Sequence, residues 1–163
     1  SGRGHPAKIV AKMNSLTDET LVLALIAAAK KGVEIDLIVR GACILPVELP
    51  ELGGRVRVRS IVGRLLEHSR VFYFNIAGDV NIWLSSADWM SRNMMRRVEV
   101  AWPIHDVMMQ KRIIDDLLTP YMQDNVDAWV LGPKGEYQAV QKTPDATAHY
   151  AVSCQALLLK KHS

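Results

Sequence analysis

The sequence lacks the features that mark disulfide-bonded, zinc-binding and membrane-spanning proteins. Its only two cysteines, Cys43 and Cys154, are far apart and show no CxxC or Cys/His spacing, so neither a disulfide framework nor a zinc site is indicated. The longest apolar run, residues 21–29, falls far short of the roughly 20 residues that a membrane-spanning helix needs, and the first residues given do not have signal-peptide architecture. We therefore expect a cytoplasmic protein with reduced, buried thiols and no transmembrane segment; peripheral association with a membrane stays open.

The charge balance gives little sign of a nucleic-acid partner, and none is expected. The net charge is only +3, whereas nucleic-acid binders usually carry a concentrated basic patch. A chain of 163 residues, 49% of them apolar, is long enough for a single globular domain that buries about 70% of its unfolded surface. Because the chain begins "SGRGHP" without methionine, we expect residues 1–163 to be one domain excised from a longer polypeptide, with residues 1–6 as a cloning remnant or linker.

Residues 7–41 predict a βαβ unit. An apolar run over residues 7–13 has strand character, and "NSLTDET" supplies cap chemistry before the apolar helix "LVLALIAAAKKG", with Thr17 as the expected N-cap. The run "VEIDLIVRG" follows at once as a second strand, so the two strands are expected to be parallel with a right-handed crossover. Residues 42–54, with two prolines and two glycines, predict a loop.

The rest of the chain predicts a mixed α/β fold. We expect strands at "RVRVRSIV", at "HSRVFYFN" and "VNIWLSS" joined by a hairpin, and at "RRVEVAWPI", ending at Pro103. The segment "HDVMMQKRIIDDLLTPYMQ" has helical periodicity, with Val107, Ile114, Leu117 and Leu118 as inward candidates. A further hairpin is expected at "AWVLGPKGEYQAV". The expected architecture is a mixed sheet flanked by helices, opening with the βαβ unit.

A histidine and an arginine stand two residues apart at the start of the fourth predicted strand. On a strand, such residues share a face and lie about 7 Å apart, so His68 and Arg70 are expected to project together. A neutral imidazole is a nucleophile near pH 7, and a guanidinium binds phosphate through two parallel donors. Alternatively, His68 is a strand-edge residue with a satisfied hydrogen bond, and this pair alone favours that structural role.

Taken with the later "SSAD", the "HSRxxxxN" stretch resembles the phospholipase D superfamily motif, HxKxxxxD followed by GSxN. Arg70 takes the lysine position, Asn75 the aspartate, Ser86 the serine and Asp88 the asparagine. Such enzymes pair two half-motifs in one site, whereas this chain has one copy. Longer blocks, "AKMNSL", "GVEIDLIVRGAC", "RVRSIVGRLLEHSR", "SSADWMSRNMMRRVEVAWPI" and "YMQDNVDAWVLGPKGEY", resemble the C-terminal domain of the larger, four-domain type of polyphosphate kinase over nearly the whole chain.

This resemblance implies a phospholipase D-like fold and a reversible transfer of the terminal phosphate of ATP to polyphosphate through an enzyme phosphohistidine. The phosphorylated histidine and most contacts to Mg²⁺ are expected in preceding domains of the same polypeptide; no metal ligand is predicted here, and the fragment alone is expected to be inactive. ATP or ADP, polyphosphate and a second copy of the full-length chain are the expected partners. The ATP and phosphate contacts map to Arg40 and His68, with Arg70 beside them, and the supporting candidates are Arg64, Ser86, Asp88 and Arg92.

The residues themselves support Arg40 as a phosphate ligand, because it lies where the second predicted strand ends, and ligands of open α/β sheets gather at such ends. A solvated loop arginine is the alternative. Arg55, Arg57 and Arg59 share one face of the third strand and are either a guide for a polyanion or a solvated charged face, which is favoured. Two other functions stay open: a phospholipase D-like phosphodiesterase acting as a homodimer, and a non-enzymatic polyanion-binding module.

Overall fold

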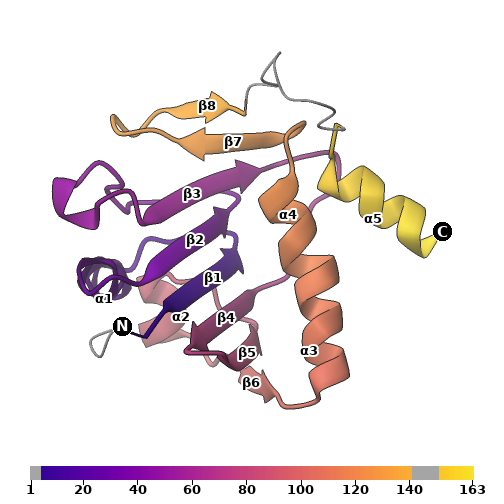
Figure 1. Cartoon of the computed structure of the whole chain (residues 1–163), viewed down its shortest axis with the longest axis horizontal. Coiled ribbons are helices and arrows are strands. Elements are labelled where there is room, and N and C mark those ends of the chain that lie inside the picture. Colours follow the sequence, from indigo (N-terminus) through magenta and orange to yellow (C-terminus); the bar gives the residue numbers. More distant parts are fainter. Residues whose placement is uncertain (1–4, 141–150) are drawn as a thin grey trace.

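The computed structural model describes residues 5–140 and 151–163, so residues 1–4 of the expected linker lie outside the described part. The strands of the described part form one sheet in the order β6-β5-β4-β1-β2-β3-β7-β8. Figure 1 shows α1 on one side of this sheet and α3, α4 and α5 on the other. The fold is therefore a mixed sheet flanked by helices on both faces, as expected.

The predicted βαβ unit is present at the centre of the sheet. It consists of β1 (Ala7–Met13), α1 (Glu19–Lys30) and β2 (Glu34–Val39), and β1 pairs with β2 in parallel. The prediction of Thr17 as the N-cap is wrong. The carboxylate of Asp18 accepts a hydrogen bond from the Leu21 backbone N–H at 3.0 Å, because the helix begins one residue later than the prediction requires. The Thr17 N–H donates instead to the carbonyl of Trp89.

The outer strands make the sheet mixed. β3 (Val56–Ile61) continues the parallel set beside β2, whereas β4 (Val71–Ile76), β5 (Asp79–Ser85), β6 (Ala101–Ile104), β7 (Ala128–Leu131) and β8 (Tyr137–Ala139) join by antiparallel pairing. Both predicted hairpins, β4–β5 and β7–β8, are confirmed. The first turns through Ala77 and Gly78, whose φ values are 54° and 94°, as a two-residue hairpin with positive φ requires.

Two predicted strands begin later than expected. β4 begins at Val71 rather than at His68, because Val71 faces Lys12 in the ladder and β1 ends at Met13. Residues 68 and 69 therefore run past the end of their partner strand. β6 begins at Ala101 and extends one residue beyond Pro103. The first residue of the predicted strand, Arg96, ends a short helix, α2 (Ser91–Arg96), and residues 97–100 are neither helix nor strand.

The helical segments differ from the prediction in three places. The loop contains a 3-10 turn, η1 (Pro50–Leu52), and a C-terminal helix, α5 (Cys154–His162), was not predicted. The long predicted helix is divided into α3 (Val107–Ile113), a π-helical turn η2 (Ile114–Leu118) and α4 (Thr119–Gln123). Pro120 has no N–H to continue the hydrogen-bond ladder, which accounts for the interruption. Leu118 is buried as predicted, but Val107 is 72% exposed, so its inward assignment is wrong.

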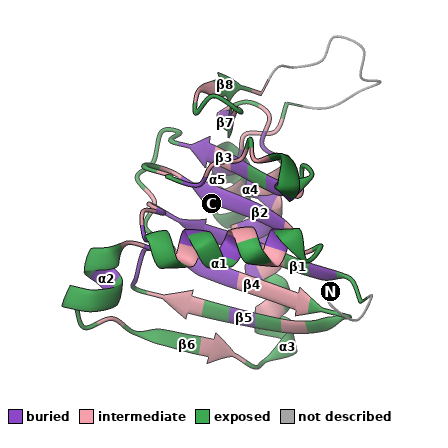
Figure 2. Cartoon of the chain, turned by 90° about the vertical axis from the view of Figure 1, so that its left-hand side faces the viewer, coloured by how far each residue is buried: buried purple, intermediate pink, exposed green. Residues whose placement is uncertain are grey.

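Apolar side chains pack on both faces of the central strands. Leu37 and Val39 join the core beneath α1, whereas the intervening Ile38 joins the core on the side of α3, α4 and α5. Figure 2 shows the buried residues concentrated in these central strands, as is usual for parallel strands covered on both faces. Cys43 and Cys154 are both free thiols, the first half-buried and the second fully buried.

Candidate functional site

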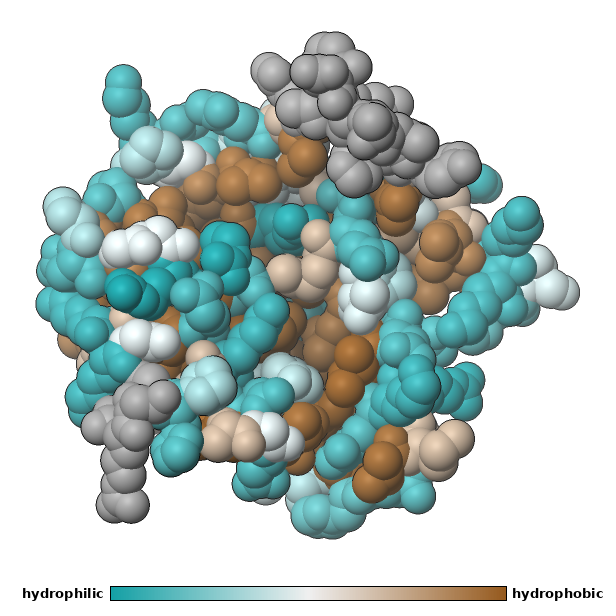
Figure 3. Space-filling model, in the orientation of Figure 1, coloured by the Kyte–Doolittle hydropathy of each residue, from teal (hydrophilic) through white to brown (hydrophobic). Residues whose placement is uncertain are grey.

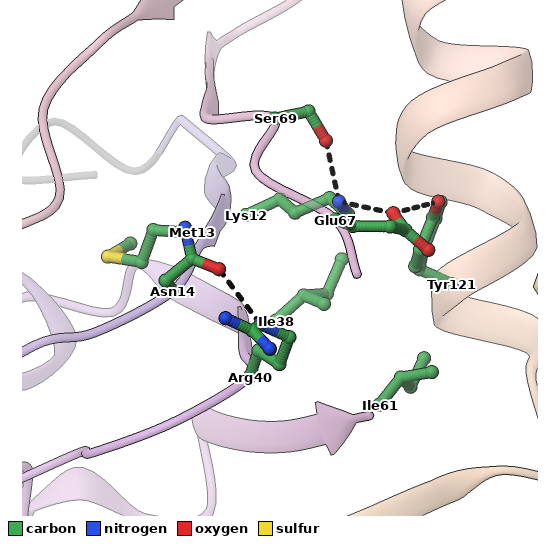
Figure 4. Close-up of a pocket in the computed structure, with 9 residues that line it drawn as sticks. All are labelled: Lys12, Met13, Asn14, Ile38, Arg40, Ile61, Glu67, Ser69 and Tyr121. Atoms are coloured by element: carbon green, nitrogen blue, oxygen red, sulfur yellow. Dashed lines mark hydrogen bonds and ion pairs between the residues drawn. The ribbon is translucent and has the colours of Figure 1, made fainter. Parts of the chain in front are cut away.

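A small pocket lies at the carboxyl ends of the three parallel strands. Lys12 and Asn14 come from the end of β1, Arg40 follows β2, Glu67 and Ser69 precede β4, and Tyr121 comes from α4 (Figure 4). Met13, Ile38 and Ile61 complete the lining. Because parallel strands end at one edge of a sheet, residues far apart in sequence meet there.

Arg40 is oriented within this pocket by the neighbouring strand. Its Nε donates to Oδ1 of Asn14 at 2.9 Å, and its carbonyl accepts a hydrogen bond from the hydroxyl of Ser60 at 2.8 Å. Among the described residues, the two terminal guanidinium nitrogens of Arg40 have no hydrogen-bond partner. These two parallel donors match the oxygens of a phosphate group. The Arg40 side chain is therefore oriented by Asn14 rather than unrestrained in a loop, and its terminal nitrogens have no partner in the described part of the chain.

A buried ion pair forms the opposite wall of the pocket. Lys12 is only 5% exposed, and its Nζ donates to Oε2 of Glu67 at 2.8 Å and to Oγ of Ser69 at 2.6 Å, above the ring of Tyr121. Figure 4 shows the lysine lying between these partners. The same carboxylate accepts hydrogen bonds from the Tyr121 hydroxyl and from Nε2 of Gln155.

The electrostatics of this network favour an ionised carboxylate. Burial raises the pKa of Glu67, but hydrogen bonds from Lys12 and Tyr121 outweigh burial and lower the pKa overall. Burial and the adjacent carboxylate together raise the pKa of Tyr121, so this phenol remains a hydrogen-bond donor. The charges of Lys12 and Glu67 thus balance each other inside the protein.

Arg70 lies against Asp88 and does not project beside His68 as predicted. Its Nε and Nη2 donate to the two carboxylate oxygens of Asp88 at 3.2 and 3.0 Å, and its Nη1 donates to the His68 carbonyl at 2.9 Å. Burial raises the pKa of Asp88, but hydrogen bonds from Arg70 and the Asn14 backbone N–H outweigh it and lower the pKa overall. The predicted shared strand face fails because these residues precede the strand.

His68 itself is exposed and does not line the pocket that contains Arg40. Both of its neighbours, Glu67 and Ser69, bind Lys12, and the imidazole has no hydrogen bond or ion pair with any described residue. The strand-edge alternative, a histidine with a satisfied hydrogen bond, is therefore not what the structure shows. The ring is available to a group outside this domain.

The remaining motif residues divide between paired and free side chains. Ser86 donates to a carboxylate oxygen of Glu99 and accepts from the Val100 N–H. Asn75 is at the far end of β4, where it bonds Tyr73 and Gly78, so it does not take part in the pocket. The side chains of Arg64 and Arg92 are exposed and have no partner within the described ranges.

The predicted arginine row is engaged with protein groups. Arg57 forms ion pairs with Asp36 at 2.6 Å and with Glu34 at 3.0 Å. Arg59 donates to the carbonyl of Tyr121 at 2.9 Å, and Arg55 donates to a carbonyl in its own loop at 3.2 Å. A row of free cations for a polyanion is therefore not present on this strand.

Sequence reasoning missed Lys12, Asn14, Glu67, Tyr121 and Gln155. Lys12 carried a signal, since a lysine within an apolar strand needs a buried partner. Gln155 carried none, because its partners are about 90 residues away in sequence and most of them are backbone groups.

The described residues include neither a metal-binding cluster nor a membrane-spanning helix. No group of three or more histidine, cysteine, aspartate or glutamate side chains in residues 5–140 and 151–163 is arranged to hold a metal ion. Within the same ranges, no helix is long and apolar enough to cross a membrane. In the pocket the Lys12 and Glu67 charges pair with each other, and the terminal nitrogens of Arg40, which have no partner among the described residues, suit an anion rather than a cation.

Known proteins resemble this chain in sequence and in fold. The polyphosphate kinase of Xylella fastidiosa (strain 9a5c) is 48% identical over 158 residues, which cover 97% of this chain and 22% of that protein. The polyphosphate kinase of Pseudomonas aeruginosa strain PAO1 is 46% identical with the same coverage. The chain therefore spans about a fifth of the length of these relatives.

Solved structures agree with the sequence relatives. The crystal structure of polyphosphate kinase from Porphyromonas gingivalis matches 98% of this chain and 24% of that chain, with a TM-score of 0.89 and 35% identity. Nuc, a phospholipase D family member from Salmonella typhimurium, matches 70% of this chain and 77% of its own chain, with a TM-score of 0.52 and 15% identity; this likeness shows a phospholipase D-like fold. The family profile described as "Polyphosphate kinase C-terminal domain 2" matches residues 1–151. This chain belongs to the polyphosphate kinase family, within that C-terminal domain.

Proposed function

We propose that this domain supplies phosphate-binding residues to a polyphosphate kinase, which moves the terminal phosphate of ATP reversibly to inorganic polyphosphate. Family membership and the pocket at the carboxyl ends of the parallel strands support this function. The observation that carries it is Arg40, which is held by Asn14 through Nε while both terminal nitrogens stay free. A phosphoryl group in transfer spreads negative charge over its equatorial oxygens, and a fixed guanidinium stabilises that charge.

In this proposal Arg40 and His68 contact phosphate groups directly, and Arg70 supports His68. Arg40 binds two oxygens of one phosphate, and the exposed His68 ring donates to the nucleotide or polyphosphate chain. Arg70 is ion-paired with Asp88, so these two residues fix the chain around His68. Arg64 and Arg92, whose side chains are free, add positive charge at the same edge, and Ser86 braces the loop after β5.

The histidine that carries the phosphoryl group is proposed to lie in the part of the polypeptide that precedes this domain. Mg²⁺ is proposed to accompany the nucleotide and to be coordinated by phosphate oxygens and residues elsewhere, because the pocket described above offers anion-binding groups. The full-length protein is proposed to act as a homo-oligomer. The free thiols of Cys43 and Cys154 support a cytoplasmic location.

The test uses the full-length polypeptide that contains this chain, assayed for ATP-dependent polyphosphate synthesis. Arg40→Ala is expected to lower kcat about 100- to 1000-fold, as is typical when a donor to a transition-state anion is removed. His68→Ala is expected to cost about 100-fold or more. Arg112→Ala is the matched control, because this arginine is exposed on α3 and has only a 3.7 Å ion pair. Activity within twofold of the unsubstituted enzyme for both Arg40→Ala and His68→Ala would overturn the proposed function.

The two alternatives from the sequence have weaker support. A polyanion-binding module would need the row of arginines on β3, and Arg57 and Arg59 are committed to protein groups. A homodimeric phosphodiesterase would rest on the likeness to the phospholipase D family member, which concerns the fold alone. Phosphodiesterase activity of a stable dimer of this chain would favour that alternative.

A further inference from the structure

We propose that Lys12 is a positioning residue that fixes the backbone around His68. This inference rests on the proposed function, because it gives Lys12 a role only if His68 contacts phosphate. The ammonium of Lys12 acts from the end of β1 and contacts the residue on each side of His68. Lys12 itself, at 5% exposure, has no free approach to a substrate.

The segment that carries His68 has no regular secondary structure of its own. Residues 64–70, the His68 segment, connect β3 to β4 and contain neither helix nor strand. Without a backbone ladder, such a segment keeps a single conformation only through side chains from other elements. Any functional position of the His68 ring therefore depends on those side-chain contacts.

Lys12 binds the side chains on both sides of the histidine. Its Nζ binds Oε2 of Glu67 at 2.8 Å and Oγ of Ser69 at 2.6 Å, the two residues that flank His68. Both neighbours are therefore held at one buried ammonium, while the intervening His68 is exposed.

Two further anchors hold the ends of the same segment. At its start, Gln155 of α5 accepts from the N–H groups of Arg64 and Leu65 and donates to the Leu65 carbonyl. At its end, Arg70 binds Asp88. Arg70 also donates to the His68 carbonyl, and Gln155 also donates to Glu67. Among the described residues, however, Lys12 is the one whose side chain binds both neighbours of His68.

The position among Glu67, Ser69 and the ring of Tyr121 suits a compact cation with several hydrogen-bond donors. The Lys12 ammonium has three donors, of which two reach Glu67 and Ser69, and the ring of Tyr121 lies 4.4 Å from Nζ. A neutral side chain of the same length would leave the Glu67 carboxylate without its counter-ion in a buried place. The carboxylate would then move toward water and take the His68 segment with it.

A double-mutant cycle in the full-length polypeptide tests whether Lys12 acts through His68. The value of kcat/KM for polyphosphate synthesis is measured for Lys12→Met, for His68→Ala and for the two together. Lys12→Met is expected to lower kcat/KM about 10- to 100-fold, since a misplacement of about 1 Å costs up to about 100-fold. In the His68→Ala background, the same change is expected to alter kcat/KM less than twofold.

The matched control is Lys8→Met. Lys8 is on the same strand and also pairs with a carboxylate, Asp36 at 3.0 Å, but it does not contact the His68 segment. Its substitution is expected to leave kcat/KM within twofold. Amide hydrogen exchange in residues 67–70 of the full-length protein should be faster in Lys12→Met and unchanged in Lys8→Met.

The outcomes distinguish a failure of the positioning role of Lys12 from a failure of the proposed function. An equal loss from Lys12→Met with and without His68, or unchanged exchange in residues 67–70, overturns the positioning role while leaving the proposed function intact. Full activity of His68→Ala instead overturns the part of the proposed function that concerns His68, and this inference with it. If Lys12→Met does not fold, Lys12→Met combined with Glu67→Gln removes both charges together, and the same cycle is run on that variant.

Discussion

Gln155 offers the sharpest test of how the C-terminal helix supports the candidate site. Its side-chain amide makes four hydrogen bonds to the His68 segment: Oε1 accepts from the N–H groups of Arg64 (2.7 Å) and Leu65 (2.8 Å), and Nε2 donates to the Leu65 carbonyl (2.9 Å) and to Glu67 (2.8 Å). The side chain is almost fully buried. Gln155→Leu keeps nearly the same volume and removes all four bonds at once.

The expected cost is about 2–4 kcal/mol in the free energy of unfolding. A net hydrogen bond contributes about 0.5–1.5 kcal/mol, and a buried group left without a partner costs about 1–3 kcal/mol. Arg64 and Leu65 lie at the surface, so water replaces part of what their backbone groups lose. The expected loss in the free energy of unfolding is therefore smaller than it would be if all four hydrogen-bonded groups were fully buried. The loss should be concentrated in the His68 segment rather than spread over the sheet.

Urea unfolding and amide hydrogen exchange of this chain measure the two parts of the expectation. The midpoint of unfolding should fall, and the amides of Arg64 and Leu65 should exchange much faster while those of β1 and β2 keep their protection. Gln138→Leu is the control, because Gln138 is exposed and makes a single side-chain bond to Glu136 at 3.1 Å. A Gln155→Leu protein no less stable than the control, with unchanged exchange at these amides, would refute the reasoning.

Three further predictions concern the hairpin, the buried carboxylates and the buried thiol. Ala77→Asn should raise the free energy of unfolding by about 0.5–1 kcal/mol, because Asn-Gly suits two positive φ values better than Ala-Gly; an unchanged urea midpoint would contradict this. The pKa values of Glu67 and Asp88 are lowered by folding, so stability should be constant above about pH 5 and fall as the pH drops below about 4. Unfolding followed by circular dichroism across this pH range measures the change in stability, and Asp88→Asn should make stability depend less on pH. Burial and the nearby Asp124 raise the pKa of Cys154, so this thiol should react with Ellman's reagent only on unfolding; rapid reaction of Cys154 in a Cys43→Ser protein would contradict this.

The sequence was sufficient for the elements whose signal is local. β1, α1 and β2 follow from one apolar run, one capped apolar helix and a second apolar run, and the β4–β5 turn follows from "IAGD". The order of the strands was not predictable in this way, since β4 inserts beside β1 while β3 lies beyond β2. The helices α2 and α5 were missed because α2 has six residues and α5 is rich in lysine at its end, so neither has a clear apolar period.

The candidate site shows the same division between local and distant signals. The position of Arg40 at the end of β2 was predictable from the strand alone, and the structure places it there. The orientation of Arg70 was not predictable from its own strand. It depends on where β1 ends and on the position of Asp88, which the fold brings beside Asn14. Period-two reasoning fails at His68 because the ladder stops at Val71, and a ladder's end depends on its partner strand.

The arginines divide into those that bind protein groups and those that do not, and this division bears on where the proposed phosphate ligand would bind. Arg57, Arg59 and Arg70 donate to carboxylates or carbonyls of the protein, so they hold the fold together. The terminal nitrogens of Arg40 and the side chain of Arg64 have no partner in the described part of the chain, and both residues lie where the parallel strands end. β4 starts at this edge and β5 returns to it, which also brings Asp88 there. On α3, by contrast, Val107, Met108 and Met109 are exposed apolar side chains. Figure 3 shows hydrophobic surface interleaved with hydrophilic surface on the face that it views. Since uncommitted cations can exchange water for phosphate oxygens, the proposed function has the polyanion approach the strand-end edge, where His68 is exposed.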